Sequence, residues 1–138
     1  MSNAKVSPAD LAEFVVKELS EWSEDVTEGV KADVKETAKE TVSMIKTNAP
    51  VDKRATKRKG RYKRGWNDKI TYEDRENIRV TVYNRTDYQL SHLLEFGHEI
   101  VRNGKTVGHV NAKPHIRPAE QTAEKKLLNR VIVRVRKG

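Results

Sequence analysis

Four histidines are the residues of this sequence with the most versatile chemistry, because imidazole binds metals and exchanges protons near neutral pH. They are His92, His98, His109 and His115. His92 and His98 stand six residues apart across an expected helix end, and no compact pattern such as His-Glu-x-x-His is present. A site assembled from three separated histidines stays open, but scattered surface or turn histidines are the simpler interpretation. We expect no metal and no cofactor.

Glu95 lies beside Phe96-Gly97-His98, and its carboxylate could work with the imidazole as an acid–base pair. The same carboxylate would equally well cap a helix, bridge two segments or pair with a lysine. The sequence has no glycine-rich phosphate loop and no serine elbow. It also has no cysteine, which excludes a disulfide framework, a thiolate zinc site and a cysteine nucleophile. We assign no catalytic residue and expect that the protein is not an enzyme.

A run of basic residues carries a functional meaning through its composition alone. Eight of the residues 53–64 are basic and none is acidic, whereas 20 basic residues face 20 acidic ones elsewhere, so the run holds the whole net charge of +8. These eight residues are Lys53, Arg54, Lys57, Arg58, Lys59, Arg61, Lys63 and Arg64. Such a density of positive charge binds phosphates regardless of nucleotide sequence. Tyr62 and Trp66 are placed to stack on bases.

In a second interpretation, the same basic run contacts an acidic surface of another protein. Residues 1–49 carry 10 acids against 6 bases, so the first helix of a neighbouring copy would offer an acidic surface. The run contains Gly60 and Gly65 and almost no apolar side chain, which predicts a flexible basic loop over residues 53–65. Phosphate-binding modules usually keep their charges on a rigid face. A contact with DNA and a contact with protein therefore both stay open.

A long helix is expected before the basic run. Ser7-Pro8-Ala9-Asp10 is typical of a helix start, and Asn48-Ala49-Pro50 of a helix end. Gly29 is the expected break, so residues 5–49 form either one helix or a helical hairpin. Between the ends, apolar residues recur every three or four positions and predict one apolar stripe. The stripe consists of Leu11, Val15, Leu19, Trp22, Val26, Val30, Val34, Ala38, Val42, Ile45 and Ala49. It is longer than a small domain can cover, which is typical of an oligomerising subunit.

The chain after the basic run alternates between apolar and polar residues, as strands do. Residues 66–72 and 78–84 flank a turn-forming cluster and predict one hairpin. The pair Asn103-Gly104 predicts a second hairpin within residues 99–110. The segment 131–136 also alternates, but it fits a strand and a prolonged helix equally well.

Helices are expected around these hairpins. A short helix carries Leu94 and Phe96, both expected in the core, and Gly97 ends it as a left-handed cap. Pro114 and Pro118 are expected to bracket an extended segment that delivers the last helix onto the sheet.

Together these elements predict one α+β domain over residues 5–138, with a long N-terminal helix, an antiparallel sheet built from hairpins, and shorter helices packed on one face. Its 138 residues suffice for one core and not for two domains. Residues 1–4 are consistent with a cloning remnant. The sequence has neither a signal-peptide pattern nor an apolar run long enough for a membrane span, so we expect no membrane contact.

Several short motifs follow one another in a characteristic order along the chain. They are Asn48-Ala49-Pro50-Val51, Arg64-Gly65-Trp66, Val82-Tyr83-Asn84, Leu94-Glu95-Phe96-Gly97-His98 and Ala112-Lys113-Pro114-His115-Ile116-Arg117-Pro118-Ala119. In this order they resemble the tail-component family of long-tailed double-stranded DNA bacteriophages, the tail-completion or head–tail joining proteins. The sequence departs from that family in its longer basic run and at His115, where the family tends to have an aromatic residue.

The resemblance implies a structural protein of the virion neck or tail that forms a homo-oligomeric ring. Its implied partners are the head connector and the tail-tube or tail-terminator proteins, and its implied locations are the virion and, during assembly, the host cytoplasm. Within these motifs, we expect the fold to be determined by Pro50, Leu94, Glu95, Phe96, Gly97, Pro114 and Pro118. A ring around a DNA channel would give the basic run a phosphate backbone to contact. The alternative is a small basic nucleic-acid-binding protein or a ribonuclease-like toxin.

Overall fold

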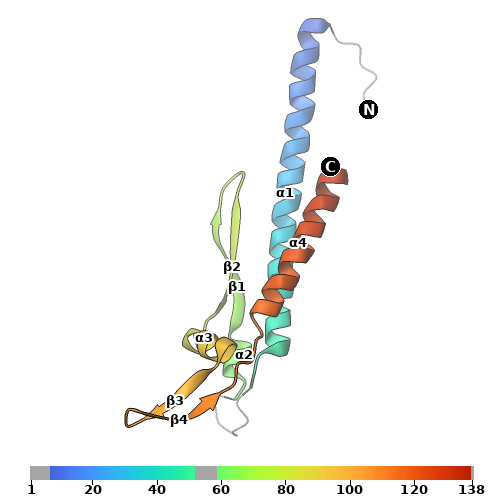
Figure 1. The fold of residues 1–138 in the computed structure, drawn as a ribbon. Helices are drawn as coiled ribbons and strands as arrows, with labels where there is room; N and C mark the ends of the chain where they lie inside the picture. Colours follow the sequence, from blue (N-terminus) through green and yellow to red (C-terminus); the bar gives the residue numbers. More distant parts are fainter. Residues whose placement is uncertain (1–6, 52–58, 138) are drawn as a thin grey trace.

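The computed structural model describes residues 7–51 and 59–137 (Figure 1). In chain order its elements are α1 (Pro8–Asn48), α2 (Arg61–Arg64), β1 (Trp66–Glu73), β2 (Ile78–Asn84), α3 (Tyr88–Phe96), β3 (His98–Arg102), β4 (Lys105–Val110) and α4 (Arg117–Lys137). The α+β class, the long N-terminal helix and the hairpins are as predicted.

The first helix, α1, is continuous over 41 residues, which makes it about 60 Å long. Ser7 caps its start at Pro8, and the Ser7 side-chain oxygen accepts a hydrogen bond from the Asp10 backbone N–H at 3.2 Å. The helical hairpin considered above is wrong, because Gly29 does not interrupt the helix. A glycine inside a helix costs only about 1 kcal/mol relative to alanine, and neighbouring elements pack along both sides of the helix near this position.

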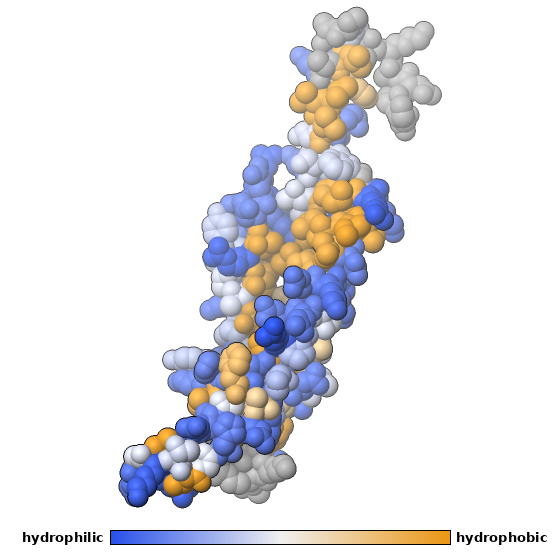
Figure 2. All heavy atoms as spheres, in the orientation of Figure 1, coloured by the Kyte–Doolittle hydropathy of each residue, from blue (hydrophilic) through white to orange (hydrophobic). Residues whose placement is uncertain are grey.

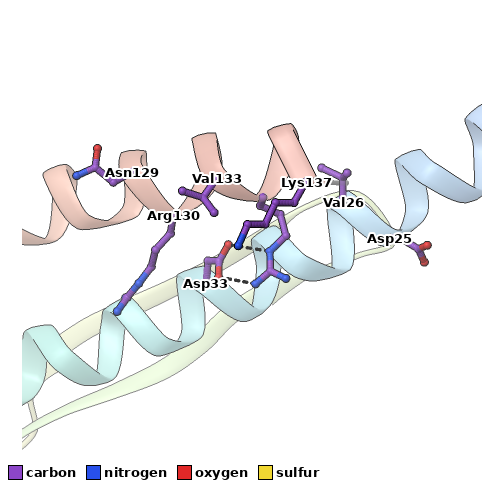
Figure 3. Close-up of a pocket in the computed structure, with 8 residues that line it drawn as sticks. Asp25, Val26, Asp33, Asn129, Arg130, Val133 and Lys137 are labelled. Carbon is purple, nitrogen blue, oxygen red and sulfur yellow. Dashed lines mark hydrogen bonds and ion pairs between the residues drawn. The ribbon is translucent and has the colours of Figure 1, made fainter.

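One of these neighbours is α4, which runs antiparallel to α1 (Figure 1). Arg134 donates to the buried carboxylate of Asp33 at 2.8 Å, and one turn earlier Arg130 donates to Glu40 at 2.6 Å. Figure 3 shows Asp33 reaching from α1 toward α4, with dashed lines for its contacts. Residues 131–136 lie within α4, so the strand alternative for this segment is wrong.

The other neighbour is the β1–β2 hairpin, which lies along the opposite flank of α1 (Figure 1). Its register pairs Trp66 with Asn84 and Glu73 with Ile78. The buried Lys31 of α1 pairs with Glu73 at 3.4 Å and also donates to a carbonyl of the hairpin turn. These contacts fix the hairpin against the middle of α1.

The second hairpin, β3–β4, extends from the end of the molecule opposite the N-terminus of α1 (Figure 1). Asn103 and Gly104 form its turn with φ of 51° and 73°, as the Asn-Gly pair predicted. The two hairpins form separate two-stranded sheets, whereas we expected them to join in one sheet.

The core is small and lies where the end of α1 meets α2, the start of β1 and the start of α4. It is formed by Val42, Ile45, Ala49, Tyr62, Trp66 and Ala119. Leu94 packs against it, as expected. Phe96 does not, since it is 64% exposed. The centre of its ring lies 4.9 Å from that of His92, one turn earlier in α3. The expectation that Phe96 belongs to the core is therefore wrong.

Candidate functional site

A buried polar cluster joins α2 to the start of α4. The Tyr62 hydroxyl lies 2.6 Å from His115 Nε2, and His115 Nδ1 lies 2.7 Å from the Lys113 carbonyl oxygen. Because a carbonyl oxygen only accepts, Nδ1 donates to Lys113, and in the neutral imidazole Nε2 then accepts from Tyr62. Burial raises the pKa of the Tyr62 hydroxyl. His115 is 1% exposed, so the expectation of surface histidines is wrong at this position.

Glu95 completes this cluster from α3. Its carboxylate accepts backbone hydrogen bonds from His115, Ile116 and Arg117, each at 2.9 Å. These N–H groups stand at the start of α4 and have no carbonyl partner within the helix. Burial raises the pKa of Glu95, but the three N–H donors lower it by more, so the net pKa lies below 4.5. Of the roles considered above, Glu95 takes that of a helix cap.

The proposed pairing of Glu95 with His98 is wrong. The Glu95 carboxylate faces His115, with Oε2 3.2 Å from Nδ1, and both of its oxygens are occupied by backbone donors. In the described part of the chain, His98 Nδ1 is buried without a hydrogen-bond partner, and no cluster of metal-ligating side chains occurs.

Asn84 performs a role that the sequence reasoning did not assign. Its side chain is buried; Nδ2 donates to the Tyr62 carbonyl at 2.7 Å, and Oδ1 accepts from the Asp87 backbone N–H at 2.8 Å. It thus ties α2 to the start of α3, where Asp87 makes no capping bond of its own. The signal was a turn-forming asparagine as the last residue of an alternating strand.

The basic run is ordered where the structure describes it. Gly60 has a φ of 75° and starts the single turn of α2. Tyr62 and Trp66 are buried, with ring centroids 5.9 Å apart in an edge-to-face arrangement. Residues 61–64 therefore form a helix where a loop was expected, and Tyr62 anchors this helix in the core. Base stacking by these two rings is also wrong.

The charges of this run divide into two groups. Lys53, Arg54, Lys57 and Arg58 lie outside the described residues. Among the others, Lys59, Arg61 and Arg64 are exposed and Lys63 is half-buried. Arg61 lies 3.6 Å from Asp87, and Arg64 donates to the Lys59 carbonyl at 3.0 Å.

The motif residues position the end of α3 and the start of α4. Gly97 has a positive φ of 75°, as expected, but its ψ of 172° is extended, so it is not a left-handed helical cap. Pro118 is the second residue of α4, and Pro114 lies in the irregular segment that leads to it. Pro50 follows the end of α1. Gly97, Pro118 and Pro50 thus lie at or next to the ends of helices.

Among the exposed apolar side chains of the described residues, those on α1 and α4 form two helix faces. The projecting end of α1, hereafter the tip (residues 8–22), exposes Leu11, Val15, Leu19 and Trp22 by 41–60%. The solvent-facing side of α4, hereafter the outer face, exposes Leu128, Ile132 and Val135. Figure 2 shows hydrophobic side chains gathered both at the tip and over the end of α4. The structure thus agrees with an apolar stripe longer than the domain covers.

The match to a family profile defines the class of this protein as a bacteriophage tail component. The chain belongs to the HK97-gp10-like family, the bacteriophage HK97-gp10 tail components, by a match over residues 11–97, more than half of its length. The matched span ends at Gly97, before β3, β4 and α4. Comparison with curated proteins and with solved structures finds no match. Within the described residues, no helix is both long and apolar enough to cross a bilayer.

Proposed function

We propose that this chain is a tail-completion or head–tail joining subunit that acts by forming a ring in the neck of the virion. Its partners are further copies of itself, the head connector on one side, and tail-tube or tail-terminator proteins on the other. It is made in the host cytoplasm and becomes part of the virion. It works by shape and docking and catalyses no reaction.

The observation that carries this proposal is the uncovered tip of α1. Four large apolar side chains on one face of a projecting helix are exposed by 41–60%. A contiguous apolar surface of this kind marks a site of protein association. Membership in a phage tail-component family supplies the setting for that association. The alternative of a nucleic-acid-binding protein or a ribonuclease-like toxin lacks such support, because Tyr62 and Trp66 are buried and Glu95 is engaged by backbone donors.

Removing this protein from its phage tests the proposal. In a phage whose gene carries a nonsense codon, we expect separate heads and tails by electron microscopy, and joined particles when the chain is supplied from a plasmid. Leu19→Glu on the apolar face should fail to restore joining, whereas Ser20→Glu on the opposite side of the helix should restore it. Joined, infectious particles in the absence of the protein would contradict the proposed function.

The basic run gives a further prediction about the same ring. We propose that its basic side chains contact the phosphate backbone of DNA in the channel. Reversing Lys57, Arg58 and Lys59 to glutamate should leave ring assembly intact and change DNA retention or ejection, measured by DNA release from purified particles. Arg61 stays unchanged in this variant, because it lies 3.6 Å from Asp87 and its reversal would disturb α2. Unchanged retention and ejection would remove DNA contact from the proposal.

A further inference from the structure

The tip of α1 and the outer face of α4 both expose apolar side chains, and the charged residues around them have opposite signs. Within residues 8–22, four acidic side chains accompany one lysine, and Glu18 and Glu21 border the apolar face of the tip. Residues 125–137 of α4 carry six basic side chains and no acidic one. One face is therefore apolar and acidic, and the other is apolar and basic.

The basic residues of α4 form two groups on different sides of the helix. Lys126, Arg130 and Arg134 face α1 of their own chain and pair there with Glu40 and Asp33. Lys125, Arg136 and Lys137 are exposed and make no ion pair within the described residues. Helical spacing places Lys125 beside Leu128 and Arg136 beside Ile132, on the outer face. The outer face thus combines an apolar centre with positive charge that is not used within the chain.

The tip cannot reach the outer face of its own chain. It lies beyond the C-terminal end of α4, and the outer face points away from α1 (Figures 1 and 2). The apolar side of the tip continues the side of α1 that α4 covers lower down, at Asp33 and Glu40. A second copy is therefore needed to supply the matching surface.

Pairing of two tips with each other is electrostatically unfavourable. It would bring Glu18 and Glu21 of both copies together, and like charges at an interface oppose association. Docking of a tip on the outer face of another copy instead brings acidic side chains against basic ones around two apolar centres. Each copy then uses one surface to bind and a different one to be bound, which is a heterologous contact.

We infer that the tip of α1, through Leu11, Val15, Leu19 and Trp22, docks on the outer face of α4 of a second copy, at Leu128, Ile132 and Val135. A heterologous contact of this kind closes into a ring when its rotation returns to the start. The inference rests on the proposed function and names the surfaces through which the ring forms.

Site-directed crosslinking tests these surfaces with little background, because the natural chain has no cysteine. Chains with Val15→Cys and chains with Ile132→Cys are mixed and treated with a short bis-maleimide. We expect a covalent dimer that contains one chain of each kind. We expect at least a fivefold lower yield from Val15→Cys alone, and from Ser20→Cys mixed with Ile132→Cys. The double variant V15C/I132C should give a ladder that ends at the copy number of the ring.

The same reaction is carried out on purified protein and on joined phage particles. Absence of the mixed product in both preparations, or Val15→Cys chains that crosslink to each other as readily, would overturn the inference. In either case the proposed function stands if the nonsense phage still requires the chain for joining. As a second measurement, E18K/E21K should lower the oligomeric mass by light scattering, and adding K125E/R136E should restore it. Loss of mass without this rescue would also count against the charge pairing.

Discussion

Glu95→Ala should lower the free energy of unfolding by about 3 kcal/mol or more, because it removes the acceptor of three backbone N–H groups at the start of α4. His115 and Ile116 then stand in a buried or half-buried region without a partner for these donors. The loss should spread to the contact between α3 and α4, since Glu95 is the side chain that joins them. Urea unfolding followed by circular dichroism measures the effect.

Glu95→Gln and Glu99→Gln are the matched variants. Glutamine keeps the shape and one acceptor oxygen but turns an N–H₂ group toward backbone donors, so Glu95→Gln should lose part of the stability. Glu99 is an exposed carboxylate on β3, and Glu99→Gln should change the free energy of unfolding by less than about 0.5 kcal/mol. Equal effects of the two glutamine variants would contradict the capping role.

The stabilisation by Glu95 should depend on pH in a defined direction. Because its folded-state pKa lies below 4.5, its contribution is present above the unfolded-state value and is lost as the pH falls through the lowered pKa. The stability difference between the natural chain and Glu95→Gln should therefore shrink below about pH 4.5. Asp74, whose pKa is lowered to about 2 mainly by its hydrogen bond from Tyr72, is present in both proteins and cancels in the difference.

Gly97→Ala should destabilise the protein by about 3 kcal/mol or more. A side chain at this position, with φ of 75°, is conformationally strained. Its Cβ would also lie 2.5 Å from the Val110 carbonyl oxygen and 2.8 Å from the Ala112 nitrogen. Both atoms belong to the backbone and cannot rotate away. Thermal unfolding and the dispersion of the amide NMR spectrum report the damage.

Gly104→Ala is the control for Gly97→Ala. Gly104 has nearly the same φ, 73°, but no atom lies within 4 Å of a Cβ built there. Its substitution should cost about 1 kcal/mol, the strain of a left-handed residue alone. If both alanine variants lost the same stability, the close approach of Val110 to Gly97 would not be important.

The sequence was sufficient to predict the elements wherever a local signal dominates. Ser7 and Pro8 mark the start of α1, and the Asn103-Gly104 pair specifies the turn of β3–β4. The interruption expected at Gly29 failed because tertiary packing along α1 outweighs the local cost of one glycine. The periodicity of apolar residues identifies the apolar face of a helix, but it does not show which neighbouring element covers that face.

The helical conformation of residues 131–136 could have been predicted from the spacing of charged residues. Lys126, Arg130 and Arg134 recur every four residues, and in α1 Asp33, Glu36 and Glu40 recur every three or four. Two helices that run antiparallel place these rows opposite each other, which a strand would not do. Hydrophobic alternation alone concealed this pattern.

The buried cluster could be predicted only in part. A capping carboxylate was among the roles considered for Glu95, but its distance from α4 is 20 to 22 residues in sequence, which no local rule detects. The core position of Tyr62 was not predicted, because basic residues surround it in the sequence. It is nevertheless the aromatic side chain that anchors α2. Phe96 was misplaced because a hydrophobic residue near the end of a short helix need not face the core.

The unsupported tip of α1 also has a consequence for the timing of assembly. Short helical stretches without tertiary contacts are marginal in water, so the amide protons of Leu11 to Leu19 should exchange with solvent far faster than those around Ile45. In the docking inferred above, the contact has to offset the entropy cost of holding this stretch helical, so each single contact should be weaker. In the proposed ring, such a subunit should therefore join and leave pairs readily, and become fixed only when contacts on two sides hold it at once.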